Sequence, residues 1–483
     1  MTDSGAGESV ASAPGERLPE GWVRATLGDL ITPASGRRQP TPSDNFPYLG
    51  MDNVESHTGR VVGFGDSATI KSSSPVVQPG YLLYGRLRPY LNKVTVAEFA
   101  GICSGEFIVF PSVEGVDSRF LLYRMLSPDF VHYVMEKNPT GDRPRAHWEQ
   151  FSDFPILLPP LPEQCRIVAK LDEQLALIRA GEASLREVER LADEFFRALL
   201  REAFSGRLVT DDFSEGKAED LVSGEARSSS EAWDTPSSWI WSRLGSLFRV
   251  SVGSTPSRGN PDFWSGDIPW VSSGEVSFKR ISETREFISR ESISKPENRI
   301  HPPGTVMLAM IGEGKTRGQS AILDIPAAHN QNCASIRVSE TEILPEFIYQ
   351  FLVSRYEETR TSASGGNQPA LNKAKVERIL VPVPPLGTQR RIVDRLADLE
   401  QERAALRAVL AESYEQASAL RGALFNAAFT GALVPQDPTD EPASALLDRI
   451  RAQRQAAVKP ARKRALRKTT SKPASSGQEE LSL

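Results

Sequence analysis

The sequence predicts an α+β protein in which two mixed α/β domains form a tandem pseudo-repeat, joined by two long helices that pack as a coiled coil. Three observations lead to this prediction. The second half of the chain repeats blocks of the first, each copy ends in about 42 residues of helical pattern, and each helical stretch follows about 145 residues rich in short β-branched runs. At 483 residues the chain is long enough for several domains.

Three matched blocks define the repeat. LPEGWVRATLGDL from Leu18 is similar to TPSSWIWSRLGSL from Thr235, at a shift of 217 residues. PPLPEQCRIVAKL from Pro159 is similar to PPLGTQRRIVDRL from Pro384, at a shift of 225 residues, and AFSGRLV recurs as AFTGALV at the same shift. Because the last two blocks keep the same spacing in both copies, we expect a rigid element of fixed length between them.

That element has the signals of a long helix. A pair of prolines precedes each stretch, and Gly206 and Gly431 stand where a left-handed C-terminal cap is expected. Steps of three and four residues predict a packing seam formed by Leu171, Ile178, Leu185, Val188, Phe195 and Leu199 in the first helix and by Leu396, Leu399, Leu406, Leu410, Leu420 and Leu424 in the second. Since Gly181, Arg403 and Ser413 interrupt the seams, the alternative is two helices that are each buried against their own domain.

These elements divide the chain into seven segments. They are a disordered N-terminus (1–16), the first mixed domain (17–160), the first helix (161–208), a polar linker (209–234), the second mixed domain (235–385), the second helix (386–434) and a basic tail expected to be disordered (435–483). The stretch from Lys459 to Pro473 in the tail has seven basic residues and no acid. Such a tail could contact phosphates without sequence preference, or it could simply keep the chain soluble.

Composition argues against several classes of protein. The net charge is −5, there is no run of eighteen apolar residues, and the first twenty residues lack a basic start and an apolar core. We therefore expect a cytoplasmic protein without a membrane partner. Three distant cysteines and five scattered histidines favour neither a disulfide framework nor a metal site.

One stretch imitates a nucleotide-binding loop. Residues Ala309 to Thr316 read AMIGEGKT, but the following RGQSAILDIP predicts a β-strand, whereas a phosphate loop needs a helix there. The repeat aligns this stretch with RLRPYLNKV, a basic loop without a glycine cradle. Glu313 and Lys315 also spell the end of a nuclease motif, but the nearest upstream Pro-Asp, at Pro261, is too distant. The sequence therefore predicts no catalytic residues.

In combination, the motifs resemble the specificity subunit of type I restriction–modification systems. They are LPEGW near the start, LRPYLNKV, LLPPLPEQ from Leu157, VGSTPSRGNPDFWSGDIPW from Val252 and the two A-F-x-G-x-L endings, and they cover almost all of residues 17–434. The resemblance implies a non-catalytic subunit with two target-recognition domains, each of which reads one half of a split DNA site. It also implies that the two spacer helices pack antiparallel.

The resemblance further implies the partners, which are double-stranded DNA, two modification subunits and two restriction subunits. The modification subunits bind S-adenosylmethionine and methylate adenine, the restriction subunits use ATP and Mg, and this chain needs no cofactor. The chain agrees in having no N-P-P-Y or D-P-P-Y signature and no helicase motif set. Because the two copies differ in their loops, we expect a non-palindromic site, and because the helical spacer has a fixed length, we expect a fixed gap between the half-sites. The competing hypothesis is an interaction protein that bridges partners without reading DNA.

Polar and basic loops supply the candidate DNA contacts. In the first copy they are Arg37, Arg38, Arg86, Arg88, Tyr90, Lys93, Arg143 and Arg145, and in the second Arg258, Lys315, Arg317, Gln319, Asn367, Gln368, Asn372 and Lys373. Arg, Asn and Gln can pair bidentately with guanine or adenine in the major groove, whereas Lys more often contacts phosphate. The alternative is a solvated surface charge or, for Arg88 and Arg143, a structural ion pair.

Two further sets have open roles. We expect the tryptophans to anchor cores or turns rather than to stack on bases, and they are Trp22, Trp239, Trp264 and Trp270. Four residues at the starts of the long helices are candidates for outward partner contacts or for helix caps, and they are Gln164, Arg166, Gln389 and Arg391.

Overall fold

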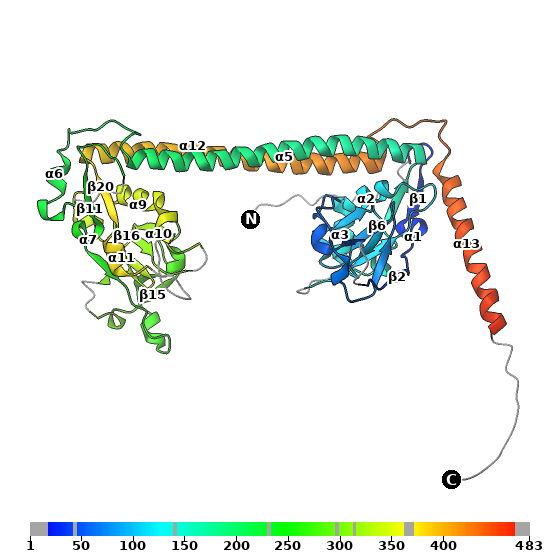
Figure 1. Ribbon diagram of the computed structural model, residues 1–483, viewed down its shortest axis with the longest axis horizontal. Coiled ribbons are helices and arrows are strands. Elements are labelled where there is room, and N and C mark those ends of the chain that lie inside the picture. The colour runs from blue at the N-terminus through cyan, green and yellow to red at the C-terminus, as the bar shows by residue number, and fades with distance from the viewer. Residues whose placement is uncertain are drawn as a thin grey trace, which may run out of the picture. The chain divides into compact units, whose positions relative to one another are not determined.

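The computed structural model describes residues 18–41, 46–138, 143–228, 233–294, 299–312, 315–361 and 371–468. The chain forms two compact units, which are unit 1 (Met1–Ser184 with Ser413–Leu483) and unit 2 (Leu185–Glu412). Each unit contains one mixed α/β domain and part of both long helices (Figure 1). The predicted fold class, two such domains and a pair of long helices, is confirmed.

In unit 1 the first and last strands of the domain pair with each other. Strand β1 (Val23–Thr26) runs antiparallel to β10 (Pro155–Leu158), with Val23 opposite Leu158. A five-stranded sheet has the order β2 (Arg37–Arg38), β5 (Ser74–Val77), β8 (Gly101–Cys103), β3 (Pro47–Leu49) and β4 (Gly65–Asp66). A three-stranded sheet has the order β7 (Val94–Val96), β6 (Leu82–Gly85) and β9 (Phe107–Phe110).

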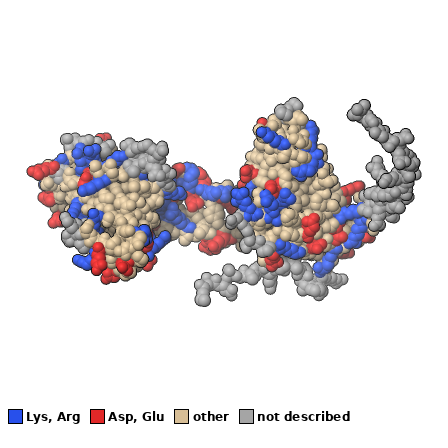
Figure 2. Space-filling view, turned by 90° about the horizontal axis from the view of Figure 1, so that it is seen from below, with Lys and Arg blue, Asp and Glu red and all other residues tan. Residues whose placement is uncertain are grey.

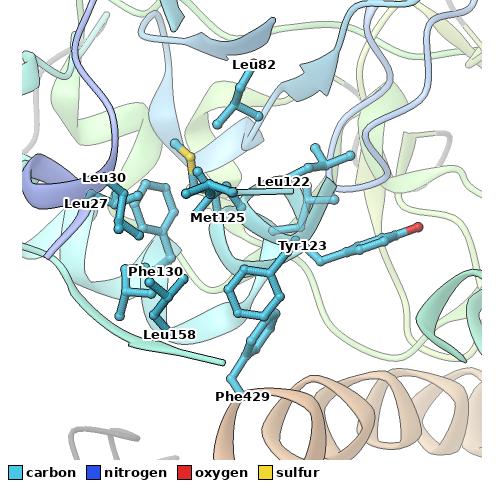
Figure 3. Packing of buried hydrophobic residues seen from close by; sticks show 14 of the residues in the cluster. Leu27, Leu30, Leu82, Leu122, Tyr123, Met125, Phe130, Leu158 and Phe429 are labelled. Atoms are coloured by element: carbon cyan, nitrogen blue, oxygen red, sulfur yellow. The ribbon is translucent and has the colours of Figure 1, made fainter. Parts of the chain in front are cut away.

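Short helices close the core of unit 1. They are α1 (Leu27–Leu30), α2 (Ser118–Leu126), α3 (Pro128–Lys137) and α4 (Trp148–Phe151), with 3-10 turns η1 (Met51–Asn53), η2 (Ser67–Thr69) and η3 (Pro89–Leu91). Figure 3 shows Leu30 of α1, Met125 of α2 and Phe130 of α3 around one apolar cluster, with Phe429 of the second long helix packed at its edge. The helix therefore contributes to the core of the domain.

Unit 2 repeats the strand pairing of unit 1. Strand β11 (Ile240–Arg243) runs antiparallel to β20 (Leu380–Val383), which also directly precedes a pair of prolines. The larger sheet has the order β12 (Val250–Val252), β19 (Cys333–Ile336), β16 (Val306–Ala309), β17 (Ser320–Leu323) and β14 (Lys279–Ile281). The smaller sheet has the order β15 (Glu286–Ile288), β13 (Ile268–Val271) and β18 (Ala328–His329).

The helices of unit 2 lie mainly after its strands. They are α6 (Ala218–Leu221), α7 (Leu244–Leu247), α9 (Pro345–Ser354), α10 (Tyr356–Thr361) and α11 (Lys373–Glu377), with 3-10 turns η4 (Gly224–Ala226), η5 (Pro261–Trp264), η6 (Ser273–Glu275), η7 (Arg290–Ser292) and η8 (Val338–Glu340). No helix within the described ranges is long and apolar enough to cross a membrane.

The long helices are α5 (Leu161–Phe204) and α12 (Leu386–Thr430), and they end as predicted at Gly206 and Gly431, which have positive φ. In unit 1 the first half of α5 shares a core cluster with the end of α12. In unit 2 the end of α5 shares one with the start of α12. Within each unit the helices are therefore antiparallel, as predicted.

The predicted packing seam is correct in part. Leu171, Ile178, Leu396, Leu399 and Leu410 are buried, and Leu185, Leu199, Leu406 and Leu424 are half-buried.

The prediction is wrong for three residues, since Val188, Phe195 and Leu420 are 43%, 64% and 59% exposed. Phe196 is buried in place of Phe195, and the guanidinium of Arg403 covers its ring at 4.6 Å. A helix of 3.6 residues per turn drifts against a strict 3.5-residue register, so a seam extrapolated over forty residues leaves the contact face.

The tail that was predicted to be disordered contains a helix, α13 (Ala443–Lys468). Its residues Ala443, Leu446, Leu447 and Ile450 are buried in the core cluster of unit 1. Their spacing of three and four residues is the signature of one apolar helix face, and the basic run that follows obscured it.

The predicted polar linker is also structured where it is described. Ala218 and Val222 are almost fully buried, and Trp233 donates a hydrogen bond from Nε1 to the carbonyl of Phe204 at 3.1 Å. The few apolar residues of this polar segment are thus enough to fix it on unit 2. Composition alone could not reveal where they dock.

Candidate nucleic-acid interface

Three loops of unit 1 lie side by side, and two of them carry residues that the sequence predicts to contact DNA. The N–H of Arg86, just after β6, donates to the carbonyl of Glu106 at 2.9 Å, and the N–H of Ala146 donates to the carbonyl of Arg86 at 2.9 Å. The N–H of Arg88 donates to the carbonyl of Pro144 at 2.8 Å. The loops after β6, before β9 and before α4 therefore form one backbone frame.

The side chains on this frame form an ion-pair cluster around Glu106. Its carboxylate accepts from Nε of Arg86 at 3.3 Å and from Nε and Nη2 of Arg145 at 3.1 and 2.9 Å. The hydrogen bonds from Arg145, together with the charges of both guanidiniums, hold the pKa of Glu106 below its usual value. Arg86 and Arg145 remain 35% and 49% exposed, so both stay accessible from solvent.

Beside this cluster lie three further predicted residues that are exposed, namely Arg88, Tyr90 and Arg143. Arg88 has a left-handed backbone with φ of 52°, a conformation that costs free energy for a residue with a Cβ. Lys93 differs from the prediction, because it is half-buried and its Nζ donates to the carbonyl of Met51 at 2.8 Å. Its ammonium group therefore stabilises the fold of the domain through a backbone carbonyl.

Arg37 and Arg38 form the exposed edge strand β2. Nη2 of Arg37 donates to the carbonyl of Ser73, and the guanidinium of Arg38 lies over the ring of Phe46 at 4.7 Å. Seen from below, both units carry Lys and Arg side chains in clusters, with acidic side chains interspersed (Figure 2). Because Arg37 and Arg38 lie on β2, the basic residues of unit 1 occur on an exposed strand as well as in the loops.

In unit 2 the predicted residue Arg258 is held from two sides. Both of its Nη atoms donate to the carboxylate of Glu286, and its guanidinium lies 3.6 Å above the ring of Trp264. Trp270 is buried next to Trp264, with ring centroids 5.0 Å apart. Arg258 therefore already uses the two nitrogens at its outer end within the protein.

The loop between β16 and β17 is no phosphate-binding loop. Its two strands pair antiparallel and β17 begins at Ser320, so a strand follows Thr316 where a phosphate loop needs a helix. Lys315 is exposed, and its carbonyl accepts from the hydroxyl of Tyr356 at 2.5 Å. Residues 313 and 314 lie outside the described ranges.

Other predictions for unit 2 are corrected. Arg317 is only 8% exposed and Gln319 is half-buried, because this part of the loop folds back onto the domain. Asn372 caps α11, with its side-chain oxygen accepting from the N–H of Lys375 at 2.9 Å. Lys373 is exposed and pairs with Glu377 at 3.4 Å.

Asn367 and Gln368 lie outside the described residues.

Two glutamines predicted as outward or capping residues are fully buried and play equivalent parts. Gln164 accepts from the N–H of Asp117 at 2.9 Å and donates to the carbonyl of Pro159 at 2.9 Å. Gln389 accepts from the N–H of Leu344 at 3.1 Å and donates to the carbonyl of Pro384 at 3.0 Å. Since Asp117 and Leu344 precede α2 and α9, each long helix is tied to a helix of its own domain.

Arg166 and Arg391 are engaged by acids. Arg166 pairs with Asp440 at 2.8 Å, and Arg391 pairs with Asp212 at 3.2 Å. Both arginines thus bind chain segments that follow a long helix. An outward role in partner binding gains no support from these contacts.

The tryptophans predicted as anchors behave as such. Trp22 and Trp239 are buried, and their Nε1 atoms donate to Glu163 at 3.0 Å and to Asp211 at 2.9 Å. Among the described residues there is no group of three His, Cys, Asp or Glu side chains placed to hold a metal ion. Sequence reasoning missed Glu106 altogether, because a single acid in a turn carries no local signal.

Known sequences that are similar to this chain are specificity subunits of type I restriction enzymes. Residues 236–412 match the family model of the type I restriction modification DNA specificity domain. The EcoDI specificity subunit of Escherichia coli is 28% identical over 210 residues, which cover 43% of this chain and 46% of that protein. The EcoR124I/EcoR124II specificity subunit of E. coli is 24% identical over 282 residues, which cover 55% and 62%. The matches thus span about half to less than two thirds of these relatives.

Solved structures share the fold over most of the chain. A chain from a study of complex assembly and conformational transition in the type I R-M system aligns with a TM-score of 0.69 and 22% identity, covering 86% of this chain and all of that one. The HsdS subunit of Thermoanaerobacter tengcongensis aligns with a TM-score of 0.51 and 22% identity, covering 87% and 99%. These similarities show that the chain has the same fold as these two solved structures.

Proposed function

We propose that this chain, as a member of the family of type I restriction–modification specificity subunits, selects the DNA sequence on which a methylating and restricting complex acts. The chain performs no chemistry itself. The observation that carries the proposal is the pseudo-repeat, which gives two domains of one architecture with different polar loops.

In this proposal each domain reads one half of a bipartite site. The exposed arginines of unit 1 surround Glu106, whereas Arg258 of unit 2 is clamped between Glu286 and Trp264. Because the two surfaces differ in chemistry, the half-sites differ and the site is not palindromic. The constant length of the two long helices gives the site a constant gap.

The complex also contains two modification subunits, which bind S-adenosylmethionine and methylate adenine, and two restriction subunits that need ATP and Mg for cleavage. Two identical partners need two equivalent docking positions. Phe195 of α5 and Leu420 of α12 are such a pair, since they are related by the 225-residue shift and both are exposed. We therefore place one modification subunit at each, in a cytoplasmic complex.

The proposal is tested by mapping methylated adenines in the host genome with the gene intact and deleted. A split, non-palindromic motif with a fixed gap should disappear on deletion and return when the gene is restored. The purified complex with the modification subunits should bind a duplex that carries the motif more tightly than one in which the motif is scrambled. Equal affinity for both duplexes would favour the competing hypothesis of a bridging protein that does not read DNA.

A further inference from the structure

The strand before Arg86 fixes the position of its backbone. Gly85 ends β6, and its N–H donates to the carbonyl of Lys93 at 2.7 Å. A Cβ at Gly85 would lie 2.8 Å from Cε of Met51 and 3.0 Å from the carbonyl oxygen of Lys93, so the backbone there is closely packed. With both neighbouring loops bonded to its own N–H and C=O, the backbone of Arg86 has little freedom.

The guanidinium of Arg86 is held by Glu106 on the side nearest its own backbone. Glu106 accepts from Nε, the nitrogen nearest the backbone, and within the described part of the chain no hydrogen bond engages Nη1 or Nη2 of Arg86. Arg145 differs, because it gives Nε and Nη2 to Glu106, and Arg258 gives both Nη atoms to Glu286. Of these three arginines, Arg86 presents the most complete outer pair of donors.

We infer that Arg86 reads a guanine in the half-site of unit 1, with Nη1 and Nη2 donating to O6 and N7, and that Glu106 and Arg145 position its guanidinium. This inference rests on the proposed function. Guanine is the base that offers two acceptors side by side in the major groove, whereas adenine offers a donor in place of one of them. Glu106 is a positioning residue, because both of its carboxylate oxygens are already occupied by arginines.

Pre-organisation is the reason for the arrangement. A free arginine side chain samples many rotamers and loses that entropy when it binds, whereas one held at Nε loses less. Glu106 also screens the repulsion between the guanidiniums of Arg86 and Arg145, which share its carboxylate. Without Glu106, Arg86 would keep its charge but lose its fixed direction.

The test uses the full chain in complex with its modification subunits and a duplex that carries the methylation motif. Dissociation constants are measured for duplexes in which each base pair of the motif is changed in turn. With the wild-type chain, one guanine should be preferred over adenine by about 5- to 150-fold. Arg86→Ala should abolish that preference and leave the preferences at all other positions unchanged.

Two further variants separate reading from folding. Arg86→Lys keeps the positive charge but cannot form the paired contact, so it should lose the preference for the same guanine while its salt dependence stays close to that of the wild type. Glu106→Gln should weaken the preference at this position alone, by a factor smaller than that of Arg86→Ala. The control is Arg60→Ala, which removes an exposed arginine that pairs with Glu55 in the same domain, and it should change no position.

The inference fails if Arg86→Ala and Arg86→Lys retain the preference at every guanine of the motif, or if the motif contains no guanine. The proposed function fails in a different way, namely when the wild-type complex binds every duplex with the same affinity. Comparable thermal midpoints for the wild type and Arg86→Lys ensure that a lost preference reports on recognition.

Discussion

At the scale of single residues, a buried pair of histidines makes unit 2 sensitive to acid. His301 and His329 are 1% and 2% exposed, with ring centroids 4.9 Å apart. Burial, together with the neighbouring imidazole of His329 and the charge of Arg337, lowers the pKa of His301 to about 2, and burial lowers the pKa of His329 to about 4. Both imidazoles are therefore neutral in the folded protein at neutral pH.

The consequence for stability follows from linkage. The folded pKa values lie below the unfolded value of about 6.5, so the unfolded state takes up protons first as the pH falls. This part of the stability is complete above pH 6.5 and is lost as the pH falls, down to about 4 for His329 and about 2 for His301. We expect the thermal midpoint of unit 2 to fall over this range, and the fall to be shallower in His329→Gln. His132→Asn, which changes an exposed histidine of unit 1, should leave the pH profile unchanged.

Single exposed apolar residues carry the second prediction at this scale. If Phe195 and Leu420 are equivalent docking positions, Phe195→Ser with Leu420→Ser should weaken binding of the modification subunit by about 1–2 kcal/mol per site. Titration calorimetry measures this directly. Leu177→Ser is the matched control, because Leu177 is also exposed on α5 but its repeat equivalent is the charged residue Glu402. An effect as large for Leu177→Ser as for the pair would refute the equivalence.

At the scale of elements, α13 acts as part of the first domain. The N–H of Ala443 donates to the carbonyl of Gly21 at 2.9 Å, and Nη1 of Arg454 donates to the carbonyl of Gly28 at 2.6 Å. Leu446 packs so closely on Gly115 that a Cβ there would lie 2.2 Å from its Cδ1. The helix thus covers apolar surface that would otherwise face water.

Truncating a side chain of this face should destabilise unit 1. Leu446→Ala creates a cavity in a closely packed site, and we expect a loss of about 2–4 kcal/mol in the free energy of unfolding. Denaturant titration measures the change, and Asp448→Ala on the exposed face of the same helix should shift stability by less than about 0.5 kcal/mol. A small effect of Leu446→Ala would mean that α13 is peripheral to the core.

At the scale of the whole molecule, the separate cores predict separate unfolding. The core clusters of unit 1 and unit 2 contain different residues, and around the boundary at Ser184 the side chains of α5 are mostly exposed. We expect two transitions in a calorimetric scan of the full chain. Leu446→Ala should lower the transition of unit 1 and leave that of unit 2 unchanged. A single transition that Leu446→Ala lowers as a whole would show that the two units unfold together.

The sequence by itself determined the repeat, the two long helices with their glycine caps, the failure of the nucleotide-loop motif and the tryptophan anchors. These features are local, because they depend on the spacing of residues along one segment. It also determined the family resemblance, because the motifs that carry it follow one another in a fixed order along the chain.

Only the tertiary structure decided what individual polar side chains do. Gln164 and Arg317 look exposed in the sequence but are buried, and α13 looks like a solvated tail but joins a core. Glu106 gathers Arg86 and Arg145 from positions 20 and 39 residues away. The physical reason is that the fate of a polar group depends on the partners that satisfy its hydrogen bonds, and those partners come from segments that only folding brings together.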